Sequence, residues 1–286
     1  MQAEAFNITT IDNNLHHSNP SILDSLRRHI LQIERSDHSK NTLPTKNKPT
    51  ISLGDSKIDA VLPWGGLPIT GLHEIFGDIA TVGFSAILLN KIIKKKLDAP
   101  ILWCQHRLDI CGHGLAEFGI NPDQIIFVNG KNDTNILWAM EEGLRSSNIA
   151  AVVGSPYKIP PIAGRRLQLV AEENNIPSLL LRPQNHNKGQ KDVIPTSSAL
   201  TRWHVTTAPS ITPANGCGLG APKWNLELQR CRYSALNLQK QSYKKIAGRK
   251  TSWQVEWCYE KGDISVASDL CNGSAQLYQN RYKKQK

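Results

Sequence analysis

The chain has 286 residues with 40% apolar and 20% charged side chains, the composition of an ordinary soluble protein with one sizeable domain and appendages. No apolar run approaches the roughly 20 residues needed to span a bilayer, and the first residues, MQAEAFNITT, lack the blocks of a secretory signal. Six cysteines without a CxxC pair then predict a cytoplasmic protein with reduced thiols, and the net charge of +10 favours nucleic acid or an acidic protein as partner.

Residues 1–50 are expected to form an arm with one helix over about residues 21–35. Four apolar residues recur there at helical spacing, namely Leu23, Leu26, Ile30 and Ile33. The stretch that follows, SDHSKNTLPTKNKPT, is polar, basic and interrupted by prolines, as is typical of a flexible linker. The helix has no partner within its own segment, so its apolar stripe is a candidate docking element for another protein or for the folded domain.

From residue 51 onward the pattern alternates between strands and helices, which indicates a parallel sheet flanked by helices in a doubly wound α/β domain. Strands are expected at residues 71–76, 101–104, 124–128, 150–153 and 178–181. Helices are expected at residues 84–96, 112–118, 136–146 and 165–174. The folded domain is expected to span residues 51–270, with a basic tail over 271–286.

After residue 198 the apolar residues alternate with polar ones, which favours antiparallel strands that extend the parallel sheet. These strands are expected at residues 199–207, 224–232, 253–259 and 264–267. Four tryptophans lie on them, and we expect these to pack in the core or at a sheet face: Trp203, Trp224, Trp253 and Trp257. The alternative use of these rings is stacking with nucleic-acid bases.

The segment 51–89 looks like a phosphate loop that lacks the residues needed to bind a phosphate. Such a loop needs a glycine-rich turn followed by Gly-Lys-Ser/Thr at the start of a helix. Here Gly77 and Gly83 frame the turn, Phe84 takes the place of the lysine, and Ser85 follows it. Five residues separate the two glycines, where the motif has four. A phenyl ring cannot neutralise a phosphate.

Two short motifs resemble the core of the RecA recombinases: Gly-Gly-Leu-Pro at residues 65–68 and Glu-Ile-x-Gly at 74–77. The resemblance runs from about residue 51 to 267 and implies a RecA-like P-loop NTPase fold, with a mainly parallel sheet flanked by helices and antiparallel C-terminal strands. It aligns Gln105 with the glutamate that activates water in RecA-like ATPases. It aligns Gly154 with the Walker B aspartate that serves the magnesium site.

The lysine, the general base and the magnesium carboxylate are thus all replaced, by Phe84, Gln105 and Gly154. Together with three neighbours they make up a degenerate nucleotide site of Gly77, Gly83, Phe84, Ser85, Gln105 and Gly154. We therefore expect a non-catalytic protein without cofactor or metal. A noncanonical ATPase with Lys91 supplying the charge is disfavoured, because Lys91 lies two helical turns beyond the loop, on the order of 10 Å along the axis.

Within this superfamily the sequence resembles the ImuA family of inducible-mutagenesis proteins. The matching segments are LGDSKIDAVLPWGGLPITGLHEI, ALTRWHV, GLGAPKWNLELQRCR and SWQVEW. The resemblance implies an adaptor in SOS-induced, error-prone translesion DNA synthesis, whose partners are an ImuB-like Y-family protein and an error-prone C-family DNA polymerase. RecA and single-stranded DNA are further candidate partners. The alternatives are a DNA-stimulated ATPase and a cell-division inhibitor that resembles SulA.

Two groups of basic residues are candidate DNA contacts. Lys188 and Lys191 lie in the polar loop over residues 182–198, and the similarly placed loop of RecA-like recombinases contacts DNA. Lys244, Lys245 and Arg249 belong to a second basic cluster. The alternative for both groups is ordinary solvated surface.

Three further constellations carry less weight. Cys104, His106, Cys111 and His113 are ligand types that suit zinc, but no second spaced cluster closes such a site. His106 with Ser155 lacks the G-x-S-x-G elbow of a hydrolase. The pair Arg165-Arg166 suits either a partner surface or a merely solvated one.

Overall fold

The computed structural model describes residues 48–96, 99–107, 110–183, 197–211, 220–232 and 251–267. All of them belong to one unit, Leu43–Lys286. Several expected features lie outside the described residues. These are the arm helix with Leu23, Leu26, Ile30 and Ile33, the basic residues Lys188, Lys191, Lys244, Lys245 and Arg249, and the C-terminal tail.

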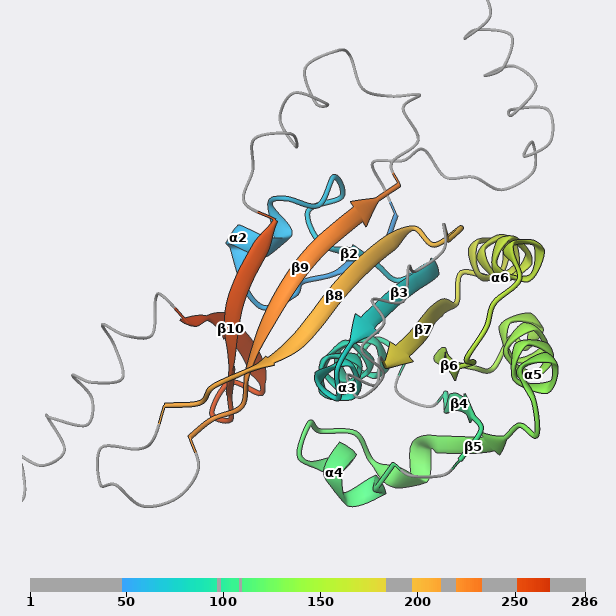
Figure 1. The fold of residues 1–286 in the computed structure, drawn as a ribbon, viewed down its shortest axis with the longest axis horizontal. Coiled ribbons are helices and arrows are strands. Elements are labelled where there is room, and N and C mark those ends of the chain that lie inside the picture. The colour runs from blue at the N-terminus through green and yellow to red at the C-terminus, as the bar shows by residue number, and fades with distance from the viewer. Residues whose placement is uncertain are drawn as a thin grey trace, which may run out of the picture. The chain divides into compact units, whose positions relative to one another are not determined.

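A large mixed sheet dominates the fold (Figure 1), and in the described residues it has nine strands in the order β11-β10-β9-β8-β3-β7-β6-β4-β5. The strands are β3 (Gly71–Gly77), β4 (Ile101–Gln105), β5 (Ile125–Asn129), β6 (Ala151–Ser155), β7 (Pro177–Pro183), β8 (Thr201–Ala208), β9 (Lys223–Cys231), β10 (Ser252–Cys258) and β11 (Asp263–Val266). Every pairing from β8 to β5 is parallel, and those from β8 to β11 are antiparallel. The sheet is therefore mostly parallel, as the alternating pattern predicts.

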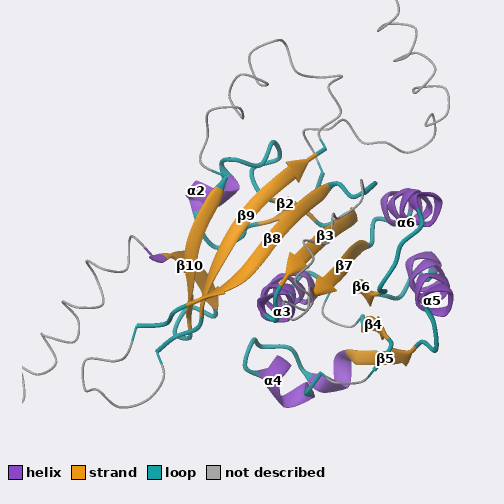
Figure 2. Ribbon diagram, viewed as in Figure 1, coloured by secondary structure: helices purple, strands orange, loops and turns teal. Residues whose placement is uncertain are grey.

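Helices cover both faces of the parallel part (Figure 2). The helices α3 (Ala80–Ile93) and α4 (Gly112–Ala116) pack on one face, and α5 (Asp133–Arg145) and α6 (Pro161–Glu173) pack on the other. Neighbouring residues of one strand accordingly enter different cores, since Trp103 packs on the α3 side and Cys104 on the α5 side. A short 3-10 helix, η2 (Pro122–Gln124), precedes β5. None of the helices in the described ranges is long and apolar enough to cross a membrane.

The C-terminal strands differ from the prediction in one respect. Strand β8 pairs in parallel with β3, and only β9, β10 and β11 add antiparallel pairings. Strand β8 lies on the side of β3 opposite β7, and β3 pairs in parallel with both. The prediction for the tryptophans is confirmed: all four are buried in one core with α3, namely Trp203, Trp224, Trp253 and Trp257.

The segment 50–68 covers the C-terminal strands. It holds a small antiparallel pair, β1 (Thr50–Ile51) with β2 (Leu67–Pro68), and the short helix α2 (Ser56–Asp59). The Asp55 carboxylate accepts a hydrogen bond from the Val266 backbone N–H of β11 at 3.3 Å. Four apolar side chains of the segment 50–68 join the same core as the tryptophans, namely Leu53, Ile58, Val61 and Leu62. This part of the ImuA-like segment therefore has a structural role.

His73 links three strands from the middle of β3. The ring is fully buried, and its Nδ1 lies 2.8 Å from Thr201 Oγ1 of β8, while its Nε2 lies 2.8 Å from the carbonyl oxygen of Pro68. Because a carbonyl oxygen only accepts, Nε2 carries the proton and Nδ1 accepts from the threonine hydroxyl. Burial lowers the pKa of His73 from 6.5 to about 4, against the opposing effect of the Pro68 carbonyl.

This buried histidine makes the stability depend on pH. The unfolded chain binds a proton at His73 near pH 6.5, whereas the folded chain binds it only near pH 4. The free energy of unfolding should therefore fall as the pH drops from 6.5 to 4, by up to about 3 kcal/mol from this residue. Urea unfolding across that range measures the effect, with His73→Gln as control because glutamine does not titrate. Equal pH slopes for the two proteins would refute the assignment.

Candidate functional site

The junction of β3 and α3, where a phosphate loop would lie, is closed by strand β8. Gly77 ends β3 with a φ of +141°, and a Cβ there would overlap the carbonyl oxygen of Val205 on β8. The Asp78 backbone N–H donates to the same oxygen at 3.3 Å. Glycine is thus required here because two backbones approach closely, and a strand occupies the space beside it.

The N-terminus of α3 already holds an anion of the protein itself. One carboxylate oxygen of Asp78 accepts a hydrogen bond from the Ala80 backbone N–H at 2.8 Å. The other accepts from the backbone N–H of Thr207 at 2.8 Å and from its hydroxyl at 2.7 Å. A helix N-terminus is where a phosphate would bind, and here a carboxylate takes that position and ties α3 to β8. Asp78 carries no motif that marks it in the sequence, and it lies two residues before the first residue of α3.

Helix α3 begins at Ala80, so the predicted start at Phe84 is wrong. The Asp78 carboxylate binds the backbone N–H of Ala80, the first residue of the helix, and Gly83, which the sequence places in a turn, lies inside the helix. A Cβ on Gly83 would press on the Trp224 ring at 3.2 Å. The Phe84 ring is fully buried, with its centroid 6.0 Å from that of Trp203. Gly83 and Phe84 are therefore helix positions that pack into the core rather than loop positions.

Ser85 is likewise a buried residue of α3. Its hydroxyl donates to the backbone carbonyl of Thr81, one turn earlier in the same helix, at 2.6 Å. The side chain thus completes a hydrogen bond within the helix instead of facing solvent.

Gln105 and Gly154 lie on neighbouring strands but face opposite sides of the sheet. In the β4–β6 register Cys104 is opposite Gly154. Gln105 is 5% exposed, and no described residue makes a hydrogen bond with its Nε2. A Cβ on Gly154 would overlap the thioether of Met140 from α5, since even the Met140 Cγ would lie within 2.9 Å. The space for an acid at position 154 is therefore filled by a methionine side chain.

A polar cluster closes the sheet edge between β4 and β6. The chain leaves these strands toward helices on opposite faces, and such a point is where α/β proteins usually bind ligands. His106 Nε2 lies 2.8 Å from Asp133, and the His106 ring stacks on Tyr157 at 4.2 Å. Asp133 also accepts from the backbone N–H groups of Tyr157 at 2.8 Å and Lys158 at 3.1 Å. Both carboxylate oxygens of Asp133 are thus bonded within the protein.

The hydrogen bonds in this cluster outweigh the effect of burial on its acid. Burial alone would raise the pKa of Asp133, but the bonds from His106 and the two backbone N–H groups lower it. The sequence pattern indicates only His106 of this cluster, because Asp133 and Tyr157 are distant from His106 in the chain and carry no recognised motif.

The possible zinc ligands lie in unlike environments. Cys104 is buried in β4, and burial raises the pKa of its thiol to about 12, whereas Cys111 is exposed. The nearest partners of the His106 ring nitrogens are Asp133 and the carbonyl of Gly130. In the ranges that the structure describes, no three His, Cys, Asp or Glu residues are grouped so that they could hold a metal ion.

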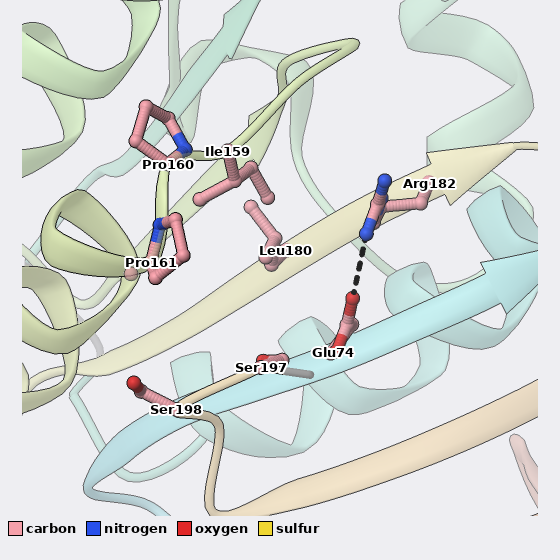
Figure 3. Close-up of a pocket in the computed structure, with 9 residues that line it drawn as sticks. Glu74, Ile159, Pro160, Pro161, Leu180, Arg182, Ser197 and Ser198 are labelled. Atoms are coloured by element: carbon pink, nitrogen blue, oxygen red, sulfur yellow. Dashed lines mark hydrogen bonds and ion pairs between the residues drawn. The ribbon is translucent and has the colours of Figure 1, made fainter. Parts of the chain in front are cut away.

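A second feature is a recess around the buried Glu74 (Figure 3). The Glu74 carboxylate accepts from Arg202 Nε at 2.8 Å and from Arg182 Nη1 at 3.3 Å, and it has no exposed surface. The lining comes from β3, β7, the start of α6 and the residues before β8: Glu74, Ile159, Pro160, Pro161, Gly164, Leu180, Arg182, Ser197 and Ser198. In the sequence Glu74 stands out only as part of the Glu-Ile-x-Gly motif, and no pattern there places Arg182 and Arg202 beside it.

Comparison with known proteins gives one extended match. The sequence is similar to Protein ImuA from two strains of Caulobacter vibrioides, at 32% identity over 193 residues, covering 64% of this chain and 79% of the relative. It is 30% identical over 91 residues to the cell division inhibitor SulA of Photorhabdus laumondii, covering 31% of this chain and 50% of that protein. No model of a protein family matches the sequence.

Among solved structures, SulA from Pseudomonas aeruginosa matches with 17% identity and a TM-score of 0.35. The match covers 40% of this chain and 98% of the SulA chain. At that TM-score the likeness does not inform the fold.

Proposed function

The chain belongs to the ImuA family, and we propose that it is a non-catalytic, RecA-like accessory protein of SOS-induced, error-prone translesion DNA synthesis. The main observation in support is the carboxylate of Asp78, which takes the backbone N–H of Ala80 at the N-terminus of α3, where a nucleotide phosphate would bind. The mostly parallel sheet with helices on both faces fits a RecA-like core.

Two further positions support the loss of hydrolysis. The Phe84 ring is buried against Trp203, and Met140 fills the space at Gly154, so neither position can present the charge that phosphoryl transfer needs. In this proposal the positions of the degenerate nucleotide site serve the fold and do not support ATP hydrolysis. They are Gly77, Gly83, Phe84, Ser85, Gln105 and Gly154. The protein works through its surfaces and needs no cofactor or metal.

In this proposal the protein acts in the cytoplasm as an adaptor. Its partners are an ImuB-like Y-family protein and an error-prone C-family DNA polymerase, with RecA as a further partner. Residues 51–270 form the RecA-like core, and the arm over 1–50 supplies the docking helix. Single-stranded DNA contacts the basic residues, namely Lys188, Lys191, Lys244, Lys245 and Arg249.

The docking helix provides the test. A Leu26→Asp, Ile30→Asp variant is expected to recover at least about tenfold less ImuB-like protein than wild type when the two are co-purified, because two charges interrupt the apolar stripe. A Ser25→Asp, Gln32→Asp variant adds the same charge to the opposite side of the expected helix and should recover the wild-type amount. Equal recovery with all three proteins would remove the helix from the interface, and failure of wild type to recover the partner would contradict the adaptor role.

The second candidate is a cell-division inhibitor, which is favoured only by the short match to SulA. Loss of polymerisation of the division tubulin homologue in the presence of this protein would support that candidate over the adaptor.

A further inference from the structure

Two arginines bond to Ser197 and Ser198 at the rim of the recess, and a third follows a residue that lines it. Arg230 donates from Nη1 to the Ser197 carbonyl oxygen at 2.9 Å, and Arg232 donates to that of Ser198 at 3.5 Å. Arg165 follows Gly164, which lines the recess from α6. We call Arg165, Arg230 and Arg232 the arginine cluster. Burial lowers the pKa of Arg232, and the charges of Arg230 and Arg165 lower it further, so the three charges act on one another.

The arginine cluster carries positive charge that its described surroundings do not neutralise. Glu74 is the acid that lines the recess, and its two oxygens are bonded to Arg182 and Arg202. In the described part of the chain no carboxylate forms an ion pair with Arg165, Arg230 or Arg232. The N-terminus of α6 adds the positive end of a helix dipole on the same side. The positive charge of the arginine cluster therefore favours an anionic ligand.

One side of the recess is apolar, and polar residues, Glu74 and Arg182 among them, line the rest (Figure 3). Ile159, Leu180 and two proline rings line it, and on the same helix start Ile162 is 77% exposed. No aromatic side chain lies among the described lining residues, whereas proteins that bind single-stranded nucleic acid stack bases on aromatic rings. A small aliphatic hollow next to guanidinium groups suits an aliphatic side chain that is flanked by carboxylates.

We propose that the arginine cluster and the recess bind an acidic peptide segment of a partner protein, with an aliphatic side chain of the segment in the recess. Guanidinium groups bind carboxylates through paired hydrogen bonds, which gives the site direction as well as charge. The proposal rests on the adaptor function and assigns one of its interfaces. Its residues lie outside the arm over 1–50.

A labelled peptide tests the site on the full-length protein. The probe is a fluorescein-labelled peptide in which one leucine is flanked by aspartates and glutamates, and fluorescence anisotropy gives its affinity. Arg165→Glu is expected to weaken binding at least about tenfold. Replacing the leucine of the peptide by serine should weaken binding to wild type as well. Lys261→Glu, at an exposed residue in the turn between β10 and β11, is the matched control and should bind as wild type does.

Arg165 is the first choice because it is exposed and bonds to no described side chain, so its loss should leave thermal unfolding unchanged. Arg232→Glu provides an independent second variant and should weaken binding in the same way. Binding that neither variant weakens would overturn the proposal. So would a wild-type preference for labelled oligo(dT) over the peptide at equal salt, since the site would then be a nucleic-acid site.

Co-purification with the ImuB-like protein separates the two proposals. If wild type recovers that partner but does not bind the peptide, the acidic-segment site is wrong and the adaptor function stands. If wild type binds the peptide through the arginine cluster but recovers no partner, the site stands and the adaptor function is wrong.

Discussion

An aspartate at position 154 is expected to lower the free energy of unfolding by about 3 kcal/mol or more and to restore no ATP hydrolysis. A Cβ at this position would overlap Met140, and a carboxylate would be buried beside the apolar core that contains Met140. Urea unfolding measures the first effect. Phosphate release from ATP, with and without single-stranded DNA, measures the second.

Two control variants separate the steric cost from the charge cost. Gly154→Ala introduces only the Cβ and should lose part of the stability, whereas Met140→Ala in the Gly154→Asp background should recover part of it by removing the overlap. A Gly154→Asp protein that unfolds like wild type would show that the position accommodates an acid. One that also hydrolyses ATP would refute the non-catalytic assignment.

Local patterns were enough to predict most of the elements. The apolar run around Val152 and Val153 predicts a strand over residues 150–153, and the structure has β6 there. A helix is predicted over residues 136–146, and α5 lies there with Ile136, Met140 and Leu144 buried. These features depend on residues that are close in the sequence, so periodicity reports them directly.

The contacts that define the sites depend on residues that are far apart in the sequence. Asp78 bonds to Thr207, which lies 129 residues later in the chain. Glu74 bonds to Arg182 and Arg202, which lie 108 and 128 residues later. No periodicity encodes such pairs. The helix start was misplaced for the same reason, because Gly83 reads as a turn until Trp224, from a distant strand, is seen to pack against it.

The three residues aligned with the lysine, the general base and the magnesium carboxylate have different surroundings. Phe84 packs against Trp203, and Gly154 leaves its space to Met140, so both residues fit the packing around them. Gln105 is different, because its buried amide nitrogen lacks a partner among the described residues. Packing at the first two positions would oppose the return of a lysine or an aspartate, which supports a function that uses the fold as a binding surface.

Glu74→Gln is expected to lower the free energy of unfolding by about 3–5 kcal/mol, because it removes the buried carboxylate that two largely buried arginines share. Glutamine has nearly the same shape as glutamate, so the loss reports charge rather than packing. Urea unfolding gives the value. Glu142→Gln is the matched control: Glu142 is half-exposed and lies 4.0 Å from Arg145, so its change should cost less than about 0.5 kcal/mol.

Replacing Glu74, Arg182 and Arg202 together by uncharged residues tests why Glu74→Gln lowers the stability. Replacing Glu74 by Leu together with Arg182→Met and Arg202→Met should recover most of the stability, since a buried ion cluster can be exchanged for apolar side chains at little cost. If Glu74→Gln costs no more than the control, water must reach Glu74, Arg182 and Arg202. If the large loss is found, Glu74 offsets one of the two positive charges beside it, and Arg165, Arg230 and Arg232 supply further positive charge that attracts an acidic partner.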